Sequence, residues 1–199
     1  MKIMVVGASG KAGKATRELL SRRGHTIVTV GRNSGDIRCD ISQPEQLSQL
    51  WSRVGRVDAV VSAAGDVPYA PLEKLGPDDY RSAFDQKVHG QIDLVRTGLP
   101  YVAERGSFTL ITGVTARDPI LQGAAAAMAN GAVESFVRAA AVEIAPQRIN
   151  AVSPSVFTES LPDYGDYFPG FAPVDLAEVA RAYQKSVEGA RTGEVIIPA

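Results

Sequence analysis

Short apolar runs alternate along this chain with longer stretches in which apolar residues recur every three or four positions. The short runs predict strands over residues 3–6, 25–30, 36–39, 57–62, 107–112, 148–154 and 194–197. The longer stretches predict helices over 14–22, 45–54, 77–105, 124–145 and 174–188. Strands and helices that alternate from end to end are typical of an α/β protein.

This alternation predicts a Rossmann-type, doubly wound and mostly parallel sheet with helices on both faces. No linker or low-complexity tract interrupts residues 1–199, so we expect one domain. Within it, Ser42 and Glu45 have the spacing of a capping box at the start of the second helix. Ligands of such sheets bind beyond the carboxyl ends of the strands, so the residues that follow each strand are the candidates for function.

A glycine-rich turn follows the first predicted strand and leads into a helix. Glycines let the backbone bend sharply and approach a pyrophosphate, which the N-terminus of the following helix binds. The same turn can be a plain strand-to-helix connection. The residues assigned to this dinucleotide cradle are Gly7, Ser9, Gly10, Lys11, Ala12 and Gly13.

A basic residue, Arg32, stands just after the second predicted strand, where an acidic residue would bind the ribose hydroxyls of NAD. A guanidinium flanked by Asn33 and Ser34 suits a 2′-phosphate, and Lys11 adds a second positive charge. The alternative is that both are solvated surface charges. We therefore expect NADP(H) rather than NAD(H) as the cofactor.

Two further strand ends carry residues assigned to cofactor binding. Asp40 is placed to accept a hydrogen bond from the adenine amino group and Ile41 to pack near the ring, although Asp40 also fits as an acid that leads into a helix. Ala63, Ala64 and Gly65 form a small-residue strand end that allows a ribose to lie against the backbone, or a tight turn without a ligand.

Composition removes several function classes. A net charge of -1 and a pI near 6.1 give no electrostatic signature of nucleic-acid or anionic-membrane binding. One cysteine, Cys39, and two histidines, His25 and His89, predict no disulfide and no metal site. With no long apolar run and no signal-peptide pattern, we expect a cytoplasmic protein whose partner is a small-molecule substrate.

Taken together, these segments resemble the short-chain dehydrogenase/reductase family over nearly the whole chain. The matching pieces are the turn at 7–13, Asp40-Ile41, Ser62–Gly65 and the segment from Arg148 to Pro154. Gly10 stands one residue earlier than in the commonest spacing, which resembles the extended or atypical branch. The resemblance implies a seven-stranded sheet, a nicotinamide cofactor with Pro154 beside it, and homo-oligomers, dimers or tetramers, built through the two long helices.

The resemblance also identifies an atypical short member that lacks the family's catalytic Ser, Tyr and Lys. Alignment puts Gly113 at the serine position, Ala126 at the tyrosine position and Asn130 at the lysine position, while Lys87 takes the place of the family's asparagine. Because Ala126 cannot donate a proton, a reduction here needs a non-standard donor.

Few side chains remain near the expected pocket. Thr112 and Lys87 are the predicted catalytic residues, and Thr115 is a second hydroxyl that could bind a substrate oxygen. Their alternatives are strand-end hydroxyls bonded to backbone and a solvated helix lysine. His89 is expected to be structural, as are Tyr164 and Tyr167 on an aromatic loop that covers the nicotinamide end or packs in the core.

The sequence therefore favours an NADP(H)-dependent oxidoreductase that acts on an unknown small carbonyl or activated-alkene substrate. The alternative from another class is a catalytically silent NADP(H)-binding sensor or interaction protein. A scaffold that binds no nucleotide is the third interpretation.

Overall fold

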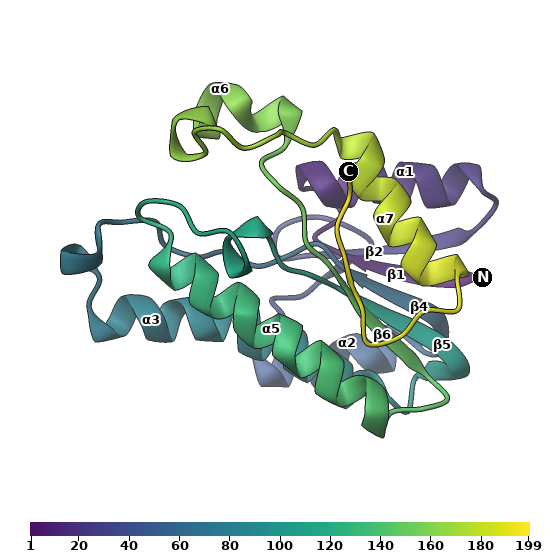
Figure 1. The fold of residues 1–199 in the computed structure, drawn as a ribbon. Coiled ribbons are helices and arrows are strands. Elements are labelled where there is room, and N and C mark those ends of the chain that lie inside the picture. The colour runs from purple at the N-terminus through teal and green to yellow at the C-terminus, as the bar shows by residue number, and fades with distance from the viewer.

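The computed structural model describes all 199 residues and contains one seven-stranded parallel sheet with strand order β3-β2-β1-β4-β5-β6-β7 (Figure 1). This confirms the predicted α/β, Rossmann-type fold. The strands are β1 (Lys2–Val6), β2 (Thr26–Gly31), β3 (Ile37–Arg38), β4 (Val57–Ser62), β5 (Val102–Ile111), β6 (Arg148–Val152) and β7 (Val195–Ile196).

Helices cover both faces of the sheet. Helices α1 and α7 pack on one face, and α2, α4 and α5 pack on the other (Figure 1). The helices are α1 (Lys11–Arg22), α2 (Pro44–Val54), α3 (Pro77–Ala83), α4 (Gly90–Gly98), α5 (Ala124–Glu143), α6 (Leu161–Tyr164) and α7 (Leu176–Glu188). None of these helices combines the length and the apolar composition that a membrane crossing requires.

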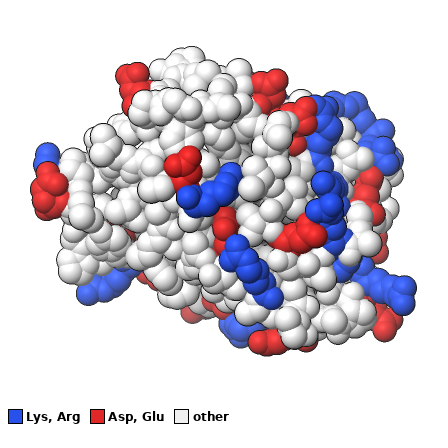
Figure 2. All heavy atoms as spheres, viewed as in Figure 1, with Lys and Arg blue, Asp and Glu red and all other residues white.

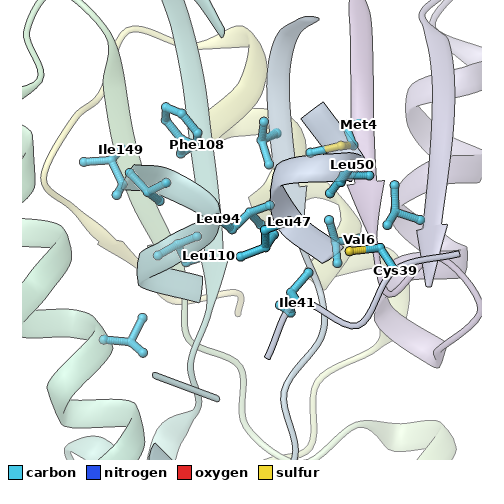
Figure 3. Close-up of a cluster of buried hydrophobic side chains, with 14 of the residues drawn as sticks. Met4, Val6, Cys39, Ile41, Leu47, Leu50, Leu94, Phe108, Leu110 and Ile149 are labelled. Carbon is cyan, nitrogen blue, oxygen red and sulfur yellow. The ribbon is translucent and has the colours of Figure 1, made fainter. Parts of the chain in front are cut away.

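Alternation along the central strands builds a core on each face. In β1, Ile3 and Val5 join the core under α1 and α7, whereas Met4 and Val6 join the core under α2, α4 and α5. Figure 3 shows Met4 and Val6 beside Leu47 and Leu50 of α2. Two cores form because successive side chains of a strand point to opposite faces of the sheet.

The helix predicted over 77–105 is wrong in extent. It consists of α3, a π-helical turn over Phe84–His89, and α4, which ends at Gly98. Pro100 lacks the backbone N–H that a continuing helix needs, and β5 already begins at Val102. The apolar spacing continued past the proline, which explains the error.

The capping box predicted at Ser42 and Glu45 is also wrong. Helix α2 begins at Pro44 with Gln43 as its N-cap and no side-chain capping bond. The Ser42 hydroxyl instead donates to Asp40 Oδ1 at 2.8 Å. Proline at the first helical position presets the helical φ, and its missing N–H is one that has no partner within a helix.

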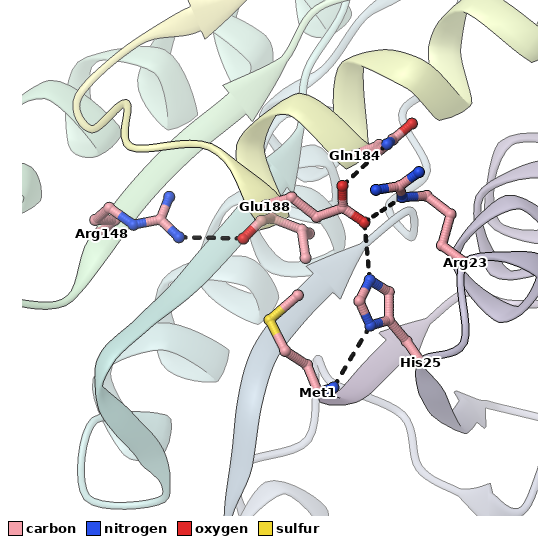
Figure 4. A network of polar contacts seen from close by, with 7 residues as sticks. Met1, Arg23, His25, Arg148, Gln184 and Glu188 are labelled. Atoms are coloured by element: carbon pink, nitrogen blue, oxygen red, sulfur yellow. Dashed lines mark hydrogen bonds and ion pairs between the residues drawn. The ribbon is translucent and has the colours of Figure 1, made fainter.

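A polar cluster connects the start of β1 with the end of α7 (Figure 4). The Glu188 carboxylate accepts from Arg23 Nε at 2.6 Å and lies 2.8 Å from His25 Nε2, while His25 Nδ1 faces the N-terminal amine at 3.5 Å. These bonds hold α7 against α1 and β1. On the face seen in Figure 2, basic and acidic side chains are interspersed.

Candidate dinucleotide site and adjoining pocket

The turn between β1 and α1 has no room for larger residues at two of its glycines. Gly7 has φ +79°, and a Cβ there would lie 2.7 Å from the Ala63 carbonyl oxygen of the neighbouring strand end. A Cβ on Gly13 would overlap the Gly7 carbonyl group. The helix therefore packs directly on the turn, and its N-terminus lies at the edge where β1 and β4 end.

The start of α1 leaves backbone donors available. Gly10 is the N-cap and supplies no side-chain bond, so the first N–H groups of the helix have no capping partner. These groups and the positive end of the helix dipole are suited to a phosphate. The glycine turn and the uncapped start of α1 therefore have a geometry that fits a pyrophosphate group.

A cavity of about 800 Å³ opens from this turn across the ends of β1, β2 and β4. It brings together most of the residues that the sequence assigned to the cofactor. Those that line it are Gly7, Ser9, Gly10, Arg32, Asn33, Asp40, Ile41, Ala63, Ala64 and Gly65. Gly13 does not line it and acts through packing. Arg81 of α3 also lines this cavity, which the sequence gave no reason to expect.

The loop after β2 is fixed before any ligand arrives. Asp36 accepts hydrogen bonds from the Thr29 backbone N–H at 2.8 Å and from its hydroxyl at 2.7 Å, and these bonds hold the pKa of Asp36 below its usual value. Gly35, at φ +105°, packs against the Thr29 carbonyl group. Arg32 projects from this loop and forms no ion pair.

Lys11 does not line the cavity that Arg32 lines. Its ammonium donates to the Glu159 carbonyl oxygen and the Ser160 hydroxyl, both at 2.9 Å, and lies 3.9 Å from Asp163. It therefore ties the start of α1 to the segment that carries α6. Asp40 Oδ1 also has protein partners, the backbone N–H and hydroxyl of Ser42.

A second cavity, of about 350 Å³, adjoins the first and shares Ala63, Gly65 and Asp66 with it. Lys11, Ala12, Lys87, Thr112 and Pro154 line this second cavity. Its apolar wall includes the aromatic side chains Tyr69, Phe157, Tyr164 and Phe168. The two cavities together cover the carboxyl edge of β1, β4, β5 and β6, which is the edge where the sequence placed the candidate residues.

Lys87 is the buried cation of this pocket. Its side chain is 7% exposed, its stem packs against Gly65, and its ammonium has no hydrogen-bond or ion-pair partner in the protein. Burial lowers the pKa of Lys87 to about 8, against an opposing attraction from Asp66. At neutral pH the group is charged, yet it gives up a proton far more readily than an exposed lysine.

The backbone around Lys87 is held by Gln91. The buried Gln91 amide donates to the carbonyl oxygens of Lys87 and Ile111, and its oxygen accepts from the Ile111 N–H at 2.9 Å. The lysine lies in the π-helical turn, a rare geometry that is frequent at functional sites. Gln91 thus fixes this turn against the end of β5.

Thr112 is buried beside the pocket, but its hydroxyl proton has a partner. It donates to Glu134 Oε1 at 3.0 Å, and Ser153 donates to the same oxygen at 3.0 Å. Arg138 lies 3.6 Å from the other carboxylate oxygen. The hydroxyl of Thr112 is therefore bound within the protein.

Thr115 and Asn130 form a second buried pair, each 4% exposed. Asn130 Nδ2 donates to Thr115 Oγ1 at 2.9 Å, and Asn130 Oδ1 has no partner. A Cβ on Gly113 would lie 3.1 Å from Asn130 Nδ2, so the glycine leaves space for the amide. Nothing in the sequence indicated this pairing.

Of the remaining candidates, His89, Tyr164 and Tyr167, only Tyr164 lines the pocket. His89 bonds to Asp85 at 3.0 Å and is well exposed, and it does not line the pocket. Tyr164 lines the pocket, while the Tyr167 ring lies 6.3 Å from that of Tyr69. No group of three His, Cys, Asp or Glu side chains is arranged to hold a metal ion.

Comparison with known proteins identifies the family. Residues 1–185 match the family model described as Enoyl-(Acyl carrier protein) reductase, of the short-chain alcohol dehydrogenase type. The crystal structure of lin1944 from Listeria innocua is 46% identical, with a TM-score of 0.98 and full coverage of both chains. A small-chain dehydrogenase solved in complex with NADPH is 23% identical, covers 99% of this chain and 95% of that one, and has a TM-score of 0.88.

Curated relatives are longer. 3-Ketodihydrosphingosine reductase of Bacteroides thetaiotaomicron is 27% identical over 81% of this chain and 65% of its own length. L-Fucose dehydrogenase of Oryctolagus cuniculus is 30% identical over 67% of this chain and 50% of its own length. The chain thus spans half to about two thirds of these proteins. The family-model match, which covers most of the chain, shows that it belongs to the short-chain dehydrogenase/reductase family.

Proposed function

We propose that this protein is an NADP(H)-dependent oxidoreductase that reduces a small carbonyl or activated-alkene substrate, with Lys87 as the proton donor. The observation that carries the proposal is an unpartnered, buried ammonium in a pocket that adjoins the dinucleotide cradle. The names of the curated relatives, reductases and dehydrogenases among them, support the same reaction class.

The residues present fit a dinucleotide. The phosphates would lie against the uncapped start of α1, and Ala63, Ala64 and Gly65 would face the riboses. The related small-chain dehydrogenase was solved with NADPH, which supports the same cofactor here. When bound, NADPH supplies a hydride.

Arg32 would select the phosphorylated cofactor. It stands directly after β2, lines the cavity and has no acidic partner to neutralise it. A free guanidinium binds a 2′-phosphate through two parallel hydrogen bonds, whereas NAD(H) offers it only a neutral hydroxyl. Asn33, beside it, adds an amide donor.

Lys87 would complete the reduction. When a carbonyl carbon gains a hydride, its oxygen becomes an alkoxide that needs a proton. The Lys87 N–H bond breaks, an O–H bond forms, and the neutral amine regains a proton from solvent. An acid with a pKa of about 8 is matched to this task near neutral pH. We assign no proton transfer to the family's usual positions, because Gly113, Ala126 and Asn130 occupy them.

The hydrogen bond from Thr112 to Glu134 argues against Thr112 as a proton donor. Because its hydroxyl donates to Glu134, Thr112 can orient Glu134 and the end of β5 but has no proton free for a substrate.

A catalytically silent NADP(H)-binding protein is the competing function, since neither Ala126 nor Thr112 supplies an acid.

The test is NADPH oxidation against a panel of aldehydes, ketones, quinones and enones, with cofactor binding followed by nicotinamide fluorescence. We expect saturable NADPH binding that Arg32→Glu weakens by about 100-fold or more, as two charge-assisted hydrogen bonds are lost. We expect Lys87→Met to lower turnover by about 10²–10⁴-fold without loss of binding. Lys74→Met, at an exposed lysine, is the control. Binding without turnover on any class would establish the silent protein instead.

A further inference from the structure

Among the hydroxyls that line this pocket, that of Thr115 accepts a hydrogen bond from a buried amide. Asn130 Nδ2 donates to Thr115 Oγ1, so one lone pair of the hydroxyl is already occupied. Thr115 Oγ1 donates to no protein group, and its proton is therefore available. The nearby Thr112 differs, because its hydroxyl donates a hydrogen bond to Glu134.

The position of the pair matches its chemistry. Thr115 and Asn130 both line the cavity that contains the Lys87 ammonium, and each is 4% exposed. Asn130 Oδ1 is buried without a partner, which is uncommon for an amide held only for structure. The glycine at 113 allows the amide to reach Thr115, since a side chain there would press on Nδ2.

From this geometry we infer that Thr115 and Lys87 form a two-donor site for the substrate's carbonyl oxygen, with Asn130 as the residue that orients the Thr115 hydroxyl. A carbonyl oxygen has two lone pairs, and two donors can meet both. The inference rests on the proposed reduction: negative charge develops on this oxygen as the carbonyl is reduced, and donors held in place by the protein stabilise it.

Asn130 has a specific part in this arrangement. In the structure the Asn130 amide N–H donates to Thr115 Oγ1, which leaves the hydroxyl proton to turn elsewhere. A carboxylate at the same place could only accept, so it would draw the Thr115 proton away from the cavity. Asn130→Asp therefore keeps the size of the side chain and the Thr115 hydroxyl, but removes the donor.

Infrared spectroscopy tests the inference without turnover. The probe is acetophenone with a ¹³C-labelled carbonyl group, bound with NADP⁺, and its aromatic ring suits a wall that includes Tyr69 and Phe168. We expect the carbonyl stretch of the bound ketone to shift to lower frequency in the wild type and in Thr115→Ser. In Thr115→Val and Asn130→Asp the shift should be smaller.

Kinetics give the second readout, with whichever ketone of the panel is reduced. We expect Thr115→Val and Asn130→Asp to lower kcat by about 10²–10³-fold with the Kd of NADPH unchanged, and Thr115→Ser to retain most activity. Ser155→Ala, which removes a hydroxyl that lines the same cavity and has no hydrogen-bond partner, should change neither readout.

Two results would overturn the inference: no shifted carbonyl band in the wild type, or a band that Thr115→Val and Asn130→Asp leave in place. A shifted band that responds to both variants, in a protein that turns over no substrate, would support the two-donor site while refuting the proposed oxidoreductase activity. Failure of the two-donor site and failure of the proposed oxidoreductase activity therefore give different results.

Discussion

Replacing Lys87 by methionine should stabilise the protein, because the fold holds a charge in a place that disfavours it. Burial lowers the pKa of this lysine from 10.5 to about 8. Each pKa unit corresponds to about 1.4 kcal/mol. The ammonium therefore lowers the free energy of unfolding by about 3 kcal/mol at neutral pH. Methionine keeps most of the stem that packs on Gly65 and removes the charge.

The pH dependence follows from the direction of the shift. Below pH 8 the lysine is protonated in both the folded and the unfolded chain, so the full cost applies. Between pH 8 and 10.5 the unfolded chain binds more protons than the folded one, and wild-type stability rises with pH relative to the variant. The advantage of Lys87→Met should accordingly shrink to zero across this window.

Urea unfolding of the cofactor-free protein at pH 7 and at several values up to pH 10.5 measures this difference. Lys74→Met removes an exposed lysine and should change the free energy of unfolding by less than about 0.5 kcal/mol at every pH. A Lys87→Met variant that is less stable than the wild type at pH 7 would refute the reasoning, since the ammonium would then have a stabilising partner. So would an advantage that does not change with pH.

Three further predictions concern other parts of the fold. Hydrogen bonds from Arg23, Gln184 and His25 lower the pKa of Glu188 to about 2, so Glu188→Gln should cost about 1–2 kcal/mol at pH 7, discounted for partial exposure, and the cost should vanish as the pH falls from 4.5 to 2 in urea titrations. Gly13→Ala should abolish NADPH binding in a fluorescence titration because its Cβ overlaps the Gly7 carbonyl, whereas Gly131→Ala, with open space around it, should bind normally and gain about 0.5–1 kcal/mol. Lys11→Met should speed amide hydrogen exchange in residues 158–164, and unchanged exchange there would show that Lys11 does not hold this segment.

The positions of the strand ends follow from local sequence patterns. A glycine turn after an apolar run, and Arg32 after the next run, are local patterns whose positions follow once the strands are recognised. Parallel strands then bring these ends to one edge without further information. This is why most of the residues assigned to the cofactor line one cavity.

Side-chain partners from distant segments could not be predicted in the same way. Lys11 looked like a second cation for a phosphate, but its partners lie 148 and 149 positions further along the chain. Thr112 looked like a free hydroxyl until the fold brought Glu134 to it. The lowered pKa of Lys87 likewise depends on packing, since only burial distinguishes it from a solvated helix lysine.

The most direct test of the account is a crystal structure of the protein with NADPH bound. We predict that the 2′-phosphate contacts Arg32, that the phosphates lie at the start of α1, and that the nicotinamide enters the cavity lined by Lys87 and Thr115. A nicotinamide ring outside that cavity, or a Lys87 ammonium paired with a protein carboxylate in the complex, would contradict it.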